Sequence, residues 1–158
     1  MMKHFHSPTK GVLSFNDVLE ELLEFIEHEP ADAYSVIVGS DSEQKTRATE
    51  YITALVIYRH GRGGRFFTAR TIQANKATLR ERIWQETTLS TDLAQTILEE
   101  FEAQGNGFCD VQIHVDIGEN GPTKDLIKEI CGFVRGMGFV VEIKPQAFAA
   151  CAVADKVI

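Results

Sequence analysis

Hydrophobic and polar positions in the first half of the chain follow two different periods. Apolar residues recur every three or four positions between Ser14 and Pro30, which predicts a helix. Short β-branched or alternating runs predict three strands, at 34–38, 51–58 and 66–72, with a glycine-rich hairpin turn between the last two. The first 13 residues show neither period, and we expect an irregular arm there.

The second half of the chain alternates between helical and strand patterns. A helical period runs over about 77–103 and stops at a pair of glycines, as helices commonly do. Beyond it, the pattern predicts a strand at 111–115, a helix at 124–137 with Thr123 as its N-cap, a strand at 139–143 and a last helix at 147–158.

This element order predicts an α/β fold. Three hairpin-connected strands followed by two helix-connected strands imply a five-stranded mixed sheet, with three antiparallel strands and two parallel ones, flanked by helices. The helix before the first strand is an addition to this pattern. We therefore expect 1–33 to be an arm and helix that pack on the core, and 34–158 to be the main domain.

Length and composition fit one domain of an ordinary globular protein, with 158 residues and 44% hydrophobic residues. No run approaches the ~20 apolar residues that a membrane helix needs, and the first residues do not resemble a signal peptide. The three cysteines show no C-x-x-C spacing and have apolar neighbours. We expect a cytoplasmic protein with reduced cysteines and no membrane partner.

Two aspartates lie at the predicted ends of strands. Asp41 comes two residues after Gly39, and Asp116 directly follows Val115. If their strands are parallel neighbours, both side chains lie at the carboxyl edge of the sheet, where ligands bind in open α/β sheets. The alternative is that each aspartate only forms a turn or caps a helix.

Two further acids lie on apolar helix faces. At about 100° per residue, Glu86 falls within about 20° of Leu79 and Ile97 on the core-facing side of its helix. Asp155 shares a face with Phe148 and Cys151, although chain-terminal residues are often simply charged. A buried carboxylate needs compensation, from a metal ion or from an internal pair with Arg or Lys.

Four converging carboxylates would form an all-oxygen site, which suits Mg²⁺ or Mn²⁺ better than zinc. The five histidines show no zinc-binding spacing. The chain also lacks a P-loop, a strand followed by G-x-G-x-x-G, and G-x-S-x-G, which argues against NTPase, dinucleotide-binding and serine-hydrolase functions.

Charge is unevenly distributed along the chain. The net charge of −7 argues mildly against a nucleic-acid partner, but residues 59–80 carry six basic residues and no acid. The six are Arg59, Arg62, Arg65, Arg70, Lys76 and Arg80. They form either a phosphate-binding strip or the solvated edge of a hairpin, and the sequence leaves both open.

The element order and the four acids together resemble the ribonuclease H superfamily over residues 34–158. More narrowly, four segments are similar to the YkuK-type group of predicted ribonuclease H-like proteins. They are Val-Gly-Ser-Asp-Ser at 38–42, Trp-Gln-Glu-Thr at 84–87, His-Val-Asp-Ile-Gly at 114–118 and Ala-Val-Ala-Asp-Lys at 152–156.

The resemblance implies a ribonuclease H-like fold and a metal-dependent nuclease acting on RNA, DNA or a hybrid. Asp41 would bridge two Mg²⁺ or Mn²⁺ ions, with Glu86 and Asp116 on one and Asp155 on the other. These four would be the catalytic and metal-binding residues. Residues expected to contact the substrate are Ser42, Glu43, Asn120, Thr123 and Lys156.

Other functions remain open at this point. The chain is alternatively a non-catalytic module of the same fold that binds nucleic acid or metal. A phosphotransferase of this fold would need a second domain, and a purely structural protein would pair its acids internally. The predicted N-terminal helix covers a sheet edge, restricts substrate access or forms a homodimer contact.

Overall fold

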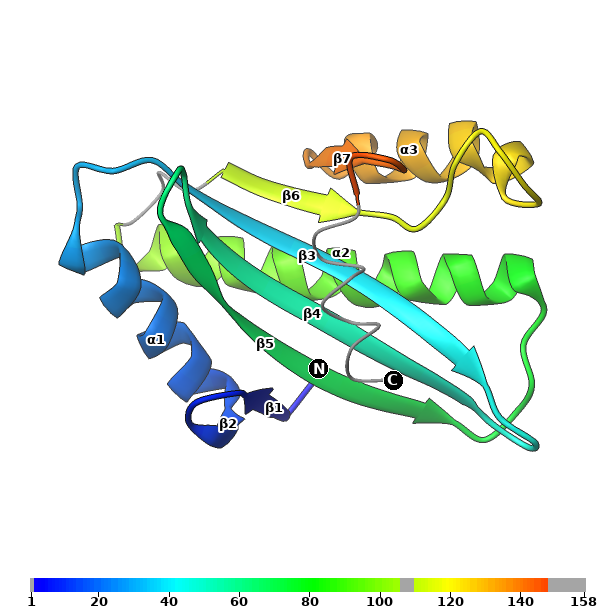
Figure 1. Ribbon diagram of the computed structural model, residues 1–158, viewed down its shortest axis with the longest axis horizontal. Helices are drawn as coiled ribbons and strands as arrows, with labels where there is room; N and C mark the ends of the chain where they lie inside the picture. Colours follow the sequence, from blue (N-terminus) through cyan, green and yellow to red (C-terminus); the bar gives the residue numbers. More distant parts are fainter. Residues whose placement is uncertain (1, 106–109, 148–158) are drawn as a thin grey trace.

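The computed structural model describes residues 2–105 and 110–147 of the chain. Its elements in order are β1 (His4–Ser7), β2 (Gly11–Ser14), α1 (Phe15–His28), β3 (Tyr34–Gln44), β4 (Thr49–Arg59), β5 (Gly63–Gln73), α2 (Leu79–Ala103), β6 (Asp110–His114), a 3-10 turn (Lys124–Leu126), α3 (Ile127–Gly136) and β7 (Val140–Glu142) (Figure 1). The predicted helix at 147–158 lies almost wholly outside the described residues.

The strands form one mixed sheet in the order β2-β1-β5-β4-β3-β6-β7. The meander β3-β4-β5 is antiparallel, and β3, β6 and β7 are parallel, which confirms the predicted mixed core of the sheet. The prediction of five strands is wrong, because the described part of the chain contributes seven.

The two additional strands come from the segment that was expected to be an irregular arm. β1 and β2 form a hairpin, and β1 joins the free edge of β5 through the pair His6 and Thr68. Each strand has only four residues, and Phe5 of β1 is the one buried large apolar side chain of the hairpin. Such short segments carry too little alternation to be recognised, and their pairing with β5 supplies the missing stabilisation.

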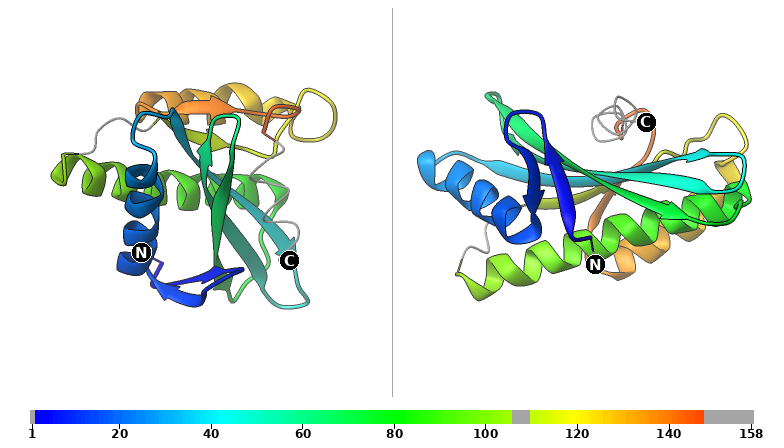
Figure 2. Two further views of the ribbon diagram at one scale, coloured as in Figure 1. Left: turned by 60° about the vertical axis from the view of Figure 1, so that its left-hand side comes forward. Right: turned by 90° about the horizontal axis from the view of Figure 1, so that it is seen from below.

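The three described α-helices lie on the same face of the sheet (Figure 2). Helix α1 contributes Val18 and Leu22 to the core, and α2 contributes Ala94 and Ile97. They pack on strand residues that alternate along β3 and β6, such as Val38 and Ile113. Both α1 and α2 begin with a capping box, formed by Ser14 with Asp17 and by Thr78 with Glu81.

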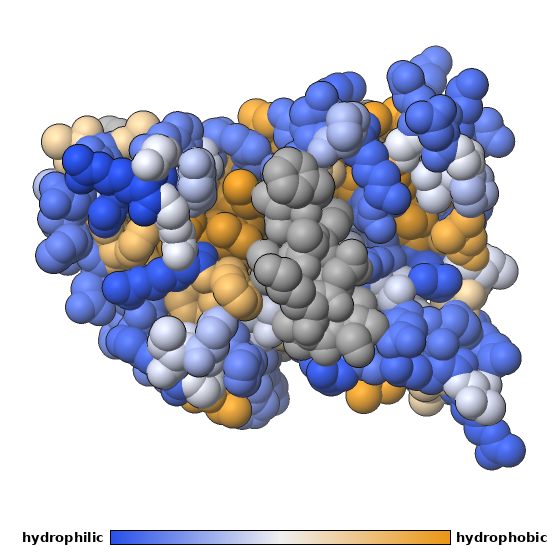
Figure 3. Space-filling view, in the orientation of Figure 1, coloured by the Kyte–Doolittle hydropathy of each residue, from blue (hydrophilic) through white to orange (hydrophobic). Residues whose placement is uncertain are grey.

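The opposite face of the sheet is the one that faces the viewer in Figure 3, where hydrophilic residues surround patches of apolar ones. Side chains of β3 and β4 that point to this side include Ile37, Ile52 and Ala54, which are buried. Within residues 2–105 and 110–147, no helix is long and apolar enough to cross a membrane.

The connection after β6 differs from the prediction. Thr123 does not cap a helix with its side chain, because the chain first forms the 3-10 turn and α3 begins only at Ile127. The Thr123 hydroxyl instead accepts a hydrogen bond from the Gly118 N–H at 3.2 Å. This bond closes the 118–123 loop on itself beside the carboxyl end of β6.

Candidate functional site

The last residues of β3 have no described strand paired with them on the side of β6. The last β3–β6 pair joins Gly39 and His114, so residues 40–44 of β3 continue beyond the end of β6. Asp41 therefore lies inside β3, and the prediction that it follows the strand is wrong. Its polar neighbours have a low strand propensity, but pairing with β4 from Ser40 to Gln44 keeps them extended.

Glu86 reaches this end of β3 from α2. Its side chain is only 4% exposed, which confirms that it lies on the core-facing side of its helix. The Ser42 hydroxyl donates to Glu86 Oε1 at 2.5 Å. The other oxygen, Oε2, is buried and has no hydrogen-bond partner among the residues that the structure describes. An unpartnered buried carboxylate oxygen is costly. Asp32 and Glu50 have one too, but an arginine lies beside each of them, whereas Glu86 has no ion pair among the described residues.

The surroundings of Glu86 disfavour its charge. Burial is the main cause that raises the pKa of Glu86 to about 8, and the negative charges of Asp41 and Asp116 raise it further. The hydrogen bond from Ser42 and the positive charge of Arg82 act in the opposite direction. Burial and the negative charge of Glu86 also raise the pKa of Tyr51, a residue of β4 that pairs with Ser42 of β3. Near neutral pH, Glu86 is therefore mostly protonated, and a cation beside it would favour the ionised form.

Arg82 lies one helical turn before Glu86 and connects α2 to β3. Its Nε donates to the Ser42 hydroxyl and its Nη2 to the Ser42 carbonyl, each at 2.9 Å. The main-chain N–H of Ser42 in turn donates to Asp41 Oδ1 at 2.8 Å. Ser42 is thus hydrogen-bonded to both acids and to the arginine, and it ties the helix to the strand.

Asp116 completes the acidic side of the site from the loop after β6. Its Oδ1 lies 2.8 Å from the Lys144 Nζ. The main chain holds Lys144 in place, because its N–H donates to the Ile117 carbonyl at 2.9 Å. Gly118 allows the close approach, since a Cβ there would lie 3.2 Å from the Cβ of Lys144. The Lys144 ammonium therefore neutralises one of the predicted metal ligands.

These residues surround one pocket of about 200 Å³. Its lining includes three of the four predicted acids, together with Arg82, Lys144, Asn120 and Thr123. Asp41, Glu86 and Asp116 are thus brought together as expected, although they come from distant parts of the sequence. Asp155 and Lys156 lie outside the described residues.

The donor chemistry of the pocket suits a hard divalent cation, because its acidic ligands are all oxygens. The buried, unpartnered Oε2 of Glu86 is a ready ligand. No group of three or more acidic, His or Cys side chains in the described ranges is spaced to hold an ion as it stands. To bind a metal ion, Asp116 would have to give up its ion pair with the Lys144 ammonium.

The predicted substrate contacts occupy different environments. Asn120 and Thr123 line the pocket. Ser42 is only 7% exposed, and its hydroxyl is engaged by Arg82 and Glu86. Glu43 points toward solvent and pairs with Lys45 at 2.6 Å. Asn120 and Thr123 are therefore the two of this group that the structure places beside the acids.

Two pocket residues were missed at the sequence level. Arg82 is four positions before Glu86, which places both on the same face of a helix, so its spacing was a usable signal. Lys144 follows β7, the last parallel strand, and lies at the same edge of the sheet as Asp116, which follows β6. Its role could not be inferred without knowing that β6 and β7 are neighbours.

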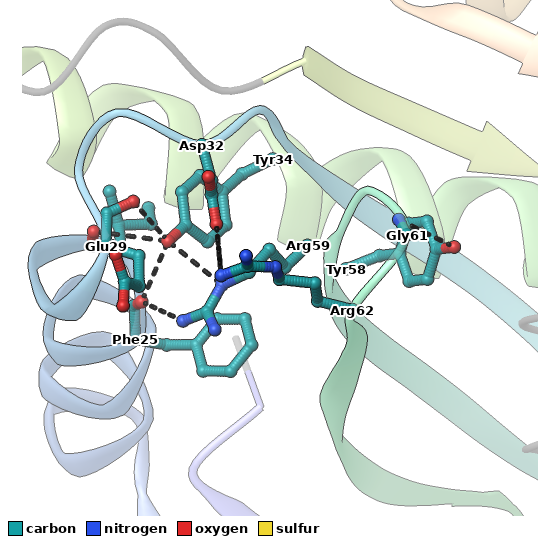
Figure 4. A network of polar contacts seen from close by, with 9 residues as sticks. Phe25, Glu29, Asp32, Tyr34, Tyr58, Arg59, Gly61 and Arg62 are labelled. Carbon is teal, nitrogen blue, oxygen red and sulfur yellow. Dashed lines mark hydrogen bonds and ion pairs between the residues drawn. The ribbon is translucent and has the colours of Figure 1, made fainter.

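The basic strip at 59–80 is engaged in ion pairs. All five of its arginines have a carboxylate partner within the described part of the chain. The pairs are Arg59 and Arg62 with Asp32, Arg65 with Glu21, Arg70 with Glu50, and Arg80 with Glu129 (Figure 4 for the first two). Each of these five arginines therefore has an acidic neighbour in this structure.

This chain is similar to known proteins. A family model described as Ribonuclease H-like matches residues 17–158. The uncharacterized protein YkuK of Bacillus subtilis (strain 168) is 32% identical over 96% of this chain and 95% of its own length. The crystal structure of RNase H1 from Halobacterium salinarum NRC-1 is 17% identical, with a TM-score of 0.38, and the match covers 77% of this chain and 96% of that one. The family match and the similarity to YkuK show that the chain belongs to the ribonuclease H-like family.

Proposed function

We propose that this protein is a nuclease that hydrolyses phosphodiester bonds in nucleic acid with Mg²⁺ or Mn²⁺ as its cofactor. The observation that carries the proposal is the buried Glu86, whose Oε2 has no partner in the described structure, in one pocket with Asp41 and Asp116. A fold retains such a costly group where a ligand compensates it. Membership of the ribonuclease H-like family supports the same assignment.

Asp41, Glu86 and Asp116 would hold the metal, together with Asp155. Bound to these carboxylates, divalent cations supply an activated water and stabilise charge on the leaving oxygen. In the reaction, the water gives up one proton and its oxygen forms a bond to phosphorus, the bond from phosphorus to the leaving oxygen breaks, and the leaving oxygen takes up a proton. Strand β3 and helix α2 are rigid elements and hold Asp41 and Glu86 in a fixed relation.

The remaining pocket residues would handle the substrate. Asn120 and Thr123 lie on the rim beside the acids, where their polar side chains would contact the sugar-phosphate backbone. Lys144 would be released from Asp116 when metal binds, and its ammonium would then face an incoming phosphate. In this exchange the metal ion would take over from Lys144 the balance of the Asp116 charge.

The test is cleavage of labelled RNA, DNA, RNA–DNA hybrid and branched junctions in Mg²⁺ or Mn²⁺. We expect metal-dependent cleavage of at least one substrate by the wild type and none by Asp116→Asn. Asp125→Asn is the matched control, because Asp125 is an exposed acid in the same connection between β6 and α3. The preferred substrate would define the nuclease class.

A second candidate is favoured by the ion pair between Lys144 and Asp116, which leaves the acids partly balanced without metal. In that case the protein is a non-catalytic module that binds nucleic acid or metal. It would bind one of the four substrates without cutting it, and Asp116→Asn would not change the result. Absence of both binding and cleavage would rule out both proposals for these polymers.

A further inference from the structure

Ser42 and Arg82 form a hydrogen-bonded chain that ends at one oxygen of Glu86. We propose that these two are positioning residues for the metal site: they fix the Glu86 carboxylate so that Oε2 faces the pocket. This inference rests on the proposed function and deepens it. It also assigns Ser42 a different role from the substrate contact that its position in the sequence suggests.

Hydrogen-bond direction in this chain follows from the chemistry of its members. The Arg82 Nε–H can only donate, so it occupies an acceptor position of the Ser42 hydroxyl. The single hydroxyl proton is then directed to Glu86 Oε1, which lies 2.5 Å away. Arg82 is held in turn by its second bond, to the Ser42 carbonyl. Two bonds from one planar guanidinium define its orientation better than one bond would.

The consequence for Glu86 is that its two oxygens have different tasks. Oε1 is fixed by Ser42, whereas Oε2 has no hydrogen-bond partner in the part of the chain that the structure describes. Side chains that orient a metal ligand through a hydrogen bond typically affect metal affinity by about 10- to 100-fold when they are replaced. Ser42 itself is buried and is not among the residues that line the pocket.

Ser40 provides a matched control on the same strand and the same sheet face. Its hydroxyl is buried and hydrogen-bonds to Thr53 and to Ser90 of α2, each at 2.8 Å. Like Ser42, it connects β3 with α2, but its partners are hydroxyls rather than an acid. Replacing Ser40 by alanine therefore removes a comparable contact without touching Glu86.

The experiment measures the affinity of the full chain for Mn²⁺ by isothermal titration calorimetry, with urea unfolding of each variant alongside. We expect Ser42→Ala to weaken Mn²⁺ binding about tenfold or more. Ser42→Thr keeps the hydroxyl and should stay within about threefold of the wild type. Ser40→Ala should leave the affinity within about twofold, although its unfolding midpoint falls as much as that of Ser42→Ala.

Arg82→Lys is the second test and leaves β3 unchanged. Lysine keeps the charge but cannot make the two-point contact with Ser42, so we expect weaker Mn²⁺ binding than in the wild type. Equal affinities for Ser42→Ala and Ser40→Ala, or full affinity in Arg82→Lys, would overturn the positioning role alone. A wild type that does not bind Mn²⁺ would overturn the proposed function and this inference together.

Discussion

The two ends of β3 accommodate buried polar groups in opposite ways. At its beginning, Arg59 of β4 donates to the Tyr34 hydroxyl and the Phe25 carbonyl and faces Asp32 (Figure 4). The Arg59 guanidinium also stacks over the Phe25 ring, 4.6 Å from its centre. At the far end, Glu86 has a partner for only one of its oxygens within the described structure.

The contrast separates a structural cluster from a candidate binding site. Asp32 Oδ2 has no hydrogen bond either, but Arg59 and Arg62 lie 3.7 and 3.6 Å from it and balance its charge. Among the residues that the structure describes, Glu86 has no ion pair of this kind, and burial together with the charges of Asp41 and Asp116 raises its pKa. A closed cluster stabilises the fold by itself, whereas an open carboxylate destabilises the fold until a cation binds.

The largest effect on stability is expected at the beginning of β3, in the cluster around Arg59. Arg59→Met should lower the free energy of unfolding by about 3 kcal/mol, because it removes the donor to the Tyr34 hydroxyl and the Phe25 carbonyl and one of the two cations beside Asp32. Urea unfolding measures this loss. Mn²⁺ affinity should not change, since Arg59 is at the other end of the strand from the pocket. A loss below about 1 kcal/mol would mean that the cluster is not structural.

At the far end of β3, substitution of Glu86 is expected to raise the free energy of unfolding instead. Without metal, the folded state keeps Glu86 protonated up to a pKa of about 8, whereas the unfolded chain loses this proton near 4.5. The contribution of Glu86 to stability is therefore lost as the pH rises from about 4.5 to 8. Glu86→Gln removes this loss and should be more stable than the wild type above pH 8 in chelator, and equal to it below pH 4.5. Parallel pH profiles of unfolding for the two proteins would contradict the assignment.

A smaller effect is expected from Lys144→Met. The Lys144 ammonium lies 2.8 Å from Asp116 Oδ1 and competes with a metal ion for that oxygen. Because the Lys144 side chain is 58% exposed, the competition is modest, and its removal should tighten Mn²⁺ binding by about three- to tenfold. Lys124→Met is the control, since Lys124 is exposed in the same region. Weaker binding in Lys144→Met would show that Lys144 supports the site rather than competing with the metal.

The smallest effect is expected for an ion pair on the exposed surface. Arg80 of α2 and Glu129 of α3 are paired at 2.5 Å, but their side chains are 58% and 42% exposed. Arg80→Ala should change the free energy of unfolding by less than about 0.5 kcal/mol. A loss comparable to that of Arg59→Met would mean that exposure does not separate the two kinds of pair.

The sequence predicted the central elements because their apolar residues repeat with a clear period. Helix α1, strands β4 and β5 and the long helix α2 were placed within a few residues. The core-facing position of Glu86 also followed from helical spacing alone. These features depend on local patterns that a sequence carries directly.

The missed features depend on contacts between distant segments. The β1–β2 hairpin needs the edge of β5, and the polar end of β3 needs its partners on β4. The roles of Ser42 and Lys144 follow from neighbours that are far away in sequence, namely Glu86 and Asp116. Tertiary pairing outweighs local propensity in all of these cases.

The most direct test at the far end of β3 is the effect of Mg²⁺ on stability at pH 7.5. At a Mg²⁺ concentration about 100 times its Kd, urea unfolding of the wild type should show a gain of about 2.7 kcal/mol. Glu86→Gln, although more stable without metal, should gain almost nothing. An equal gain in both proteins, or none in the wild type, would contradict the claim that Glu86 holds a divalent cation.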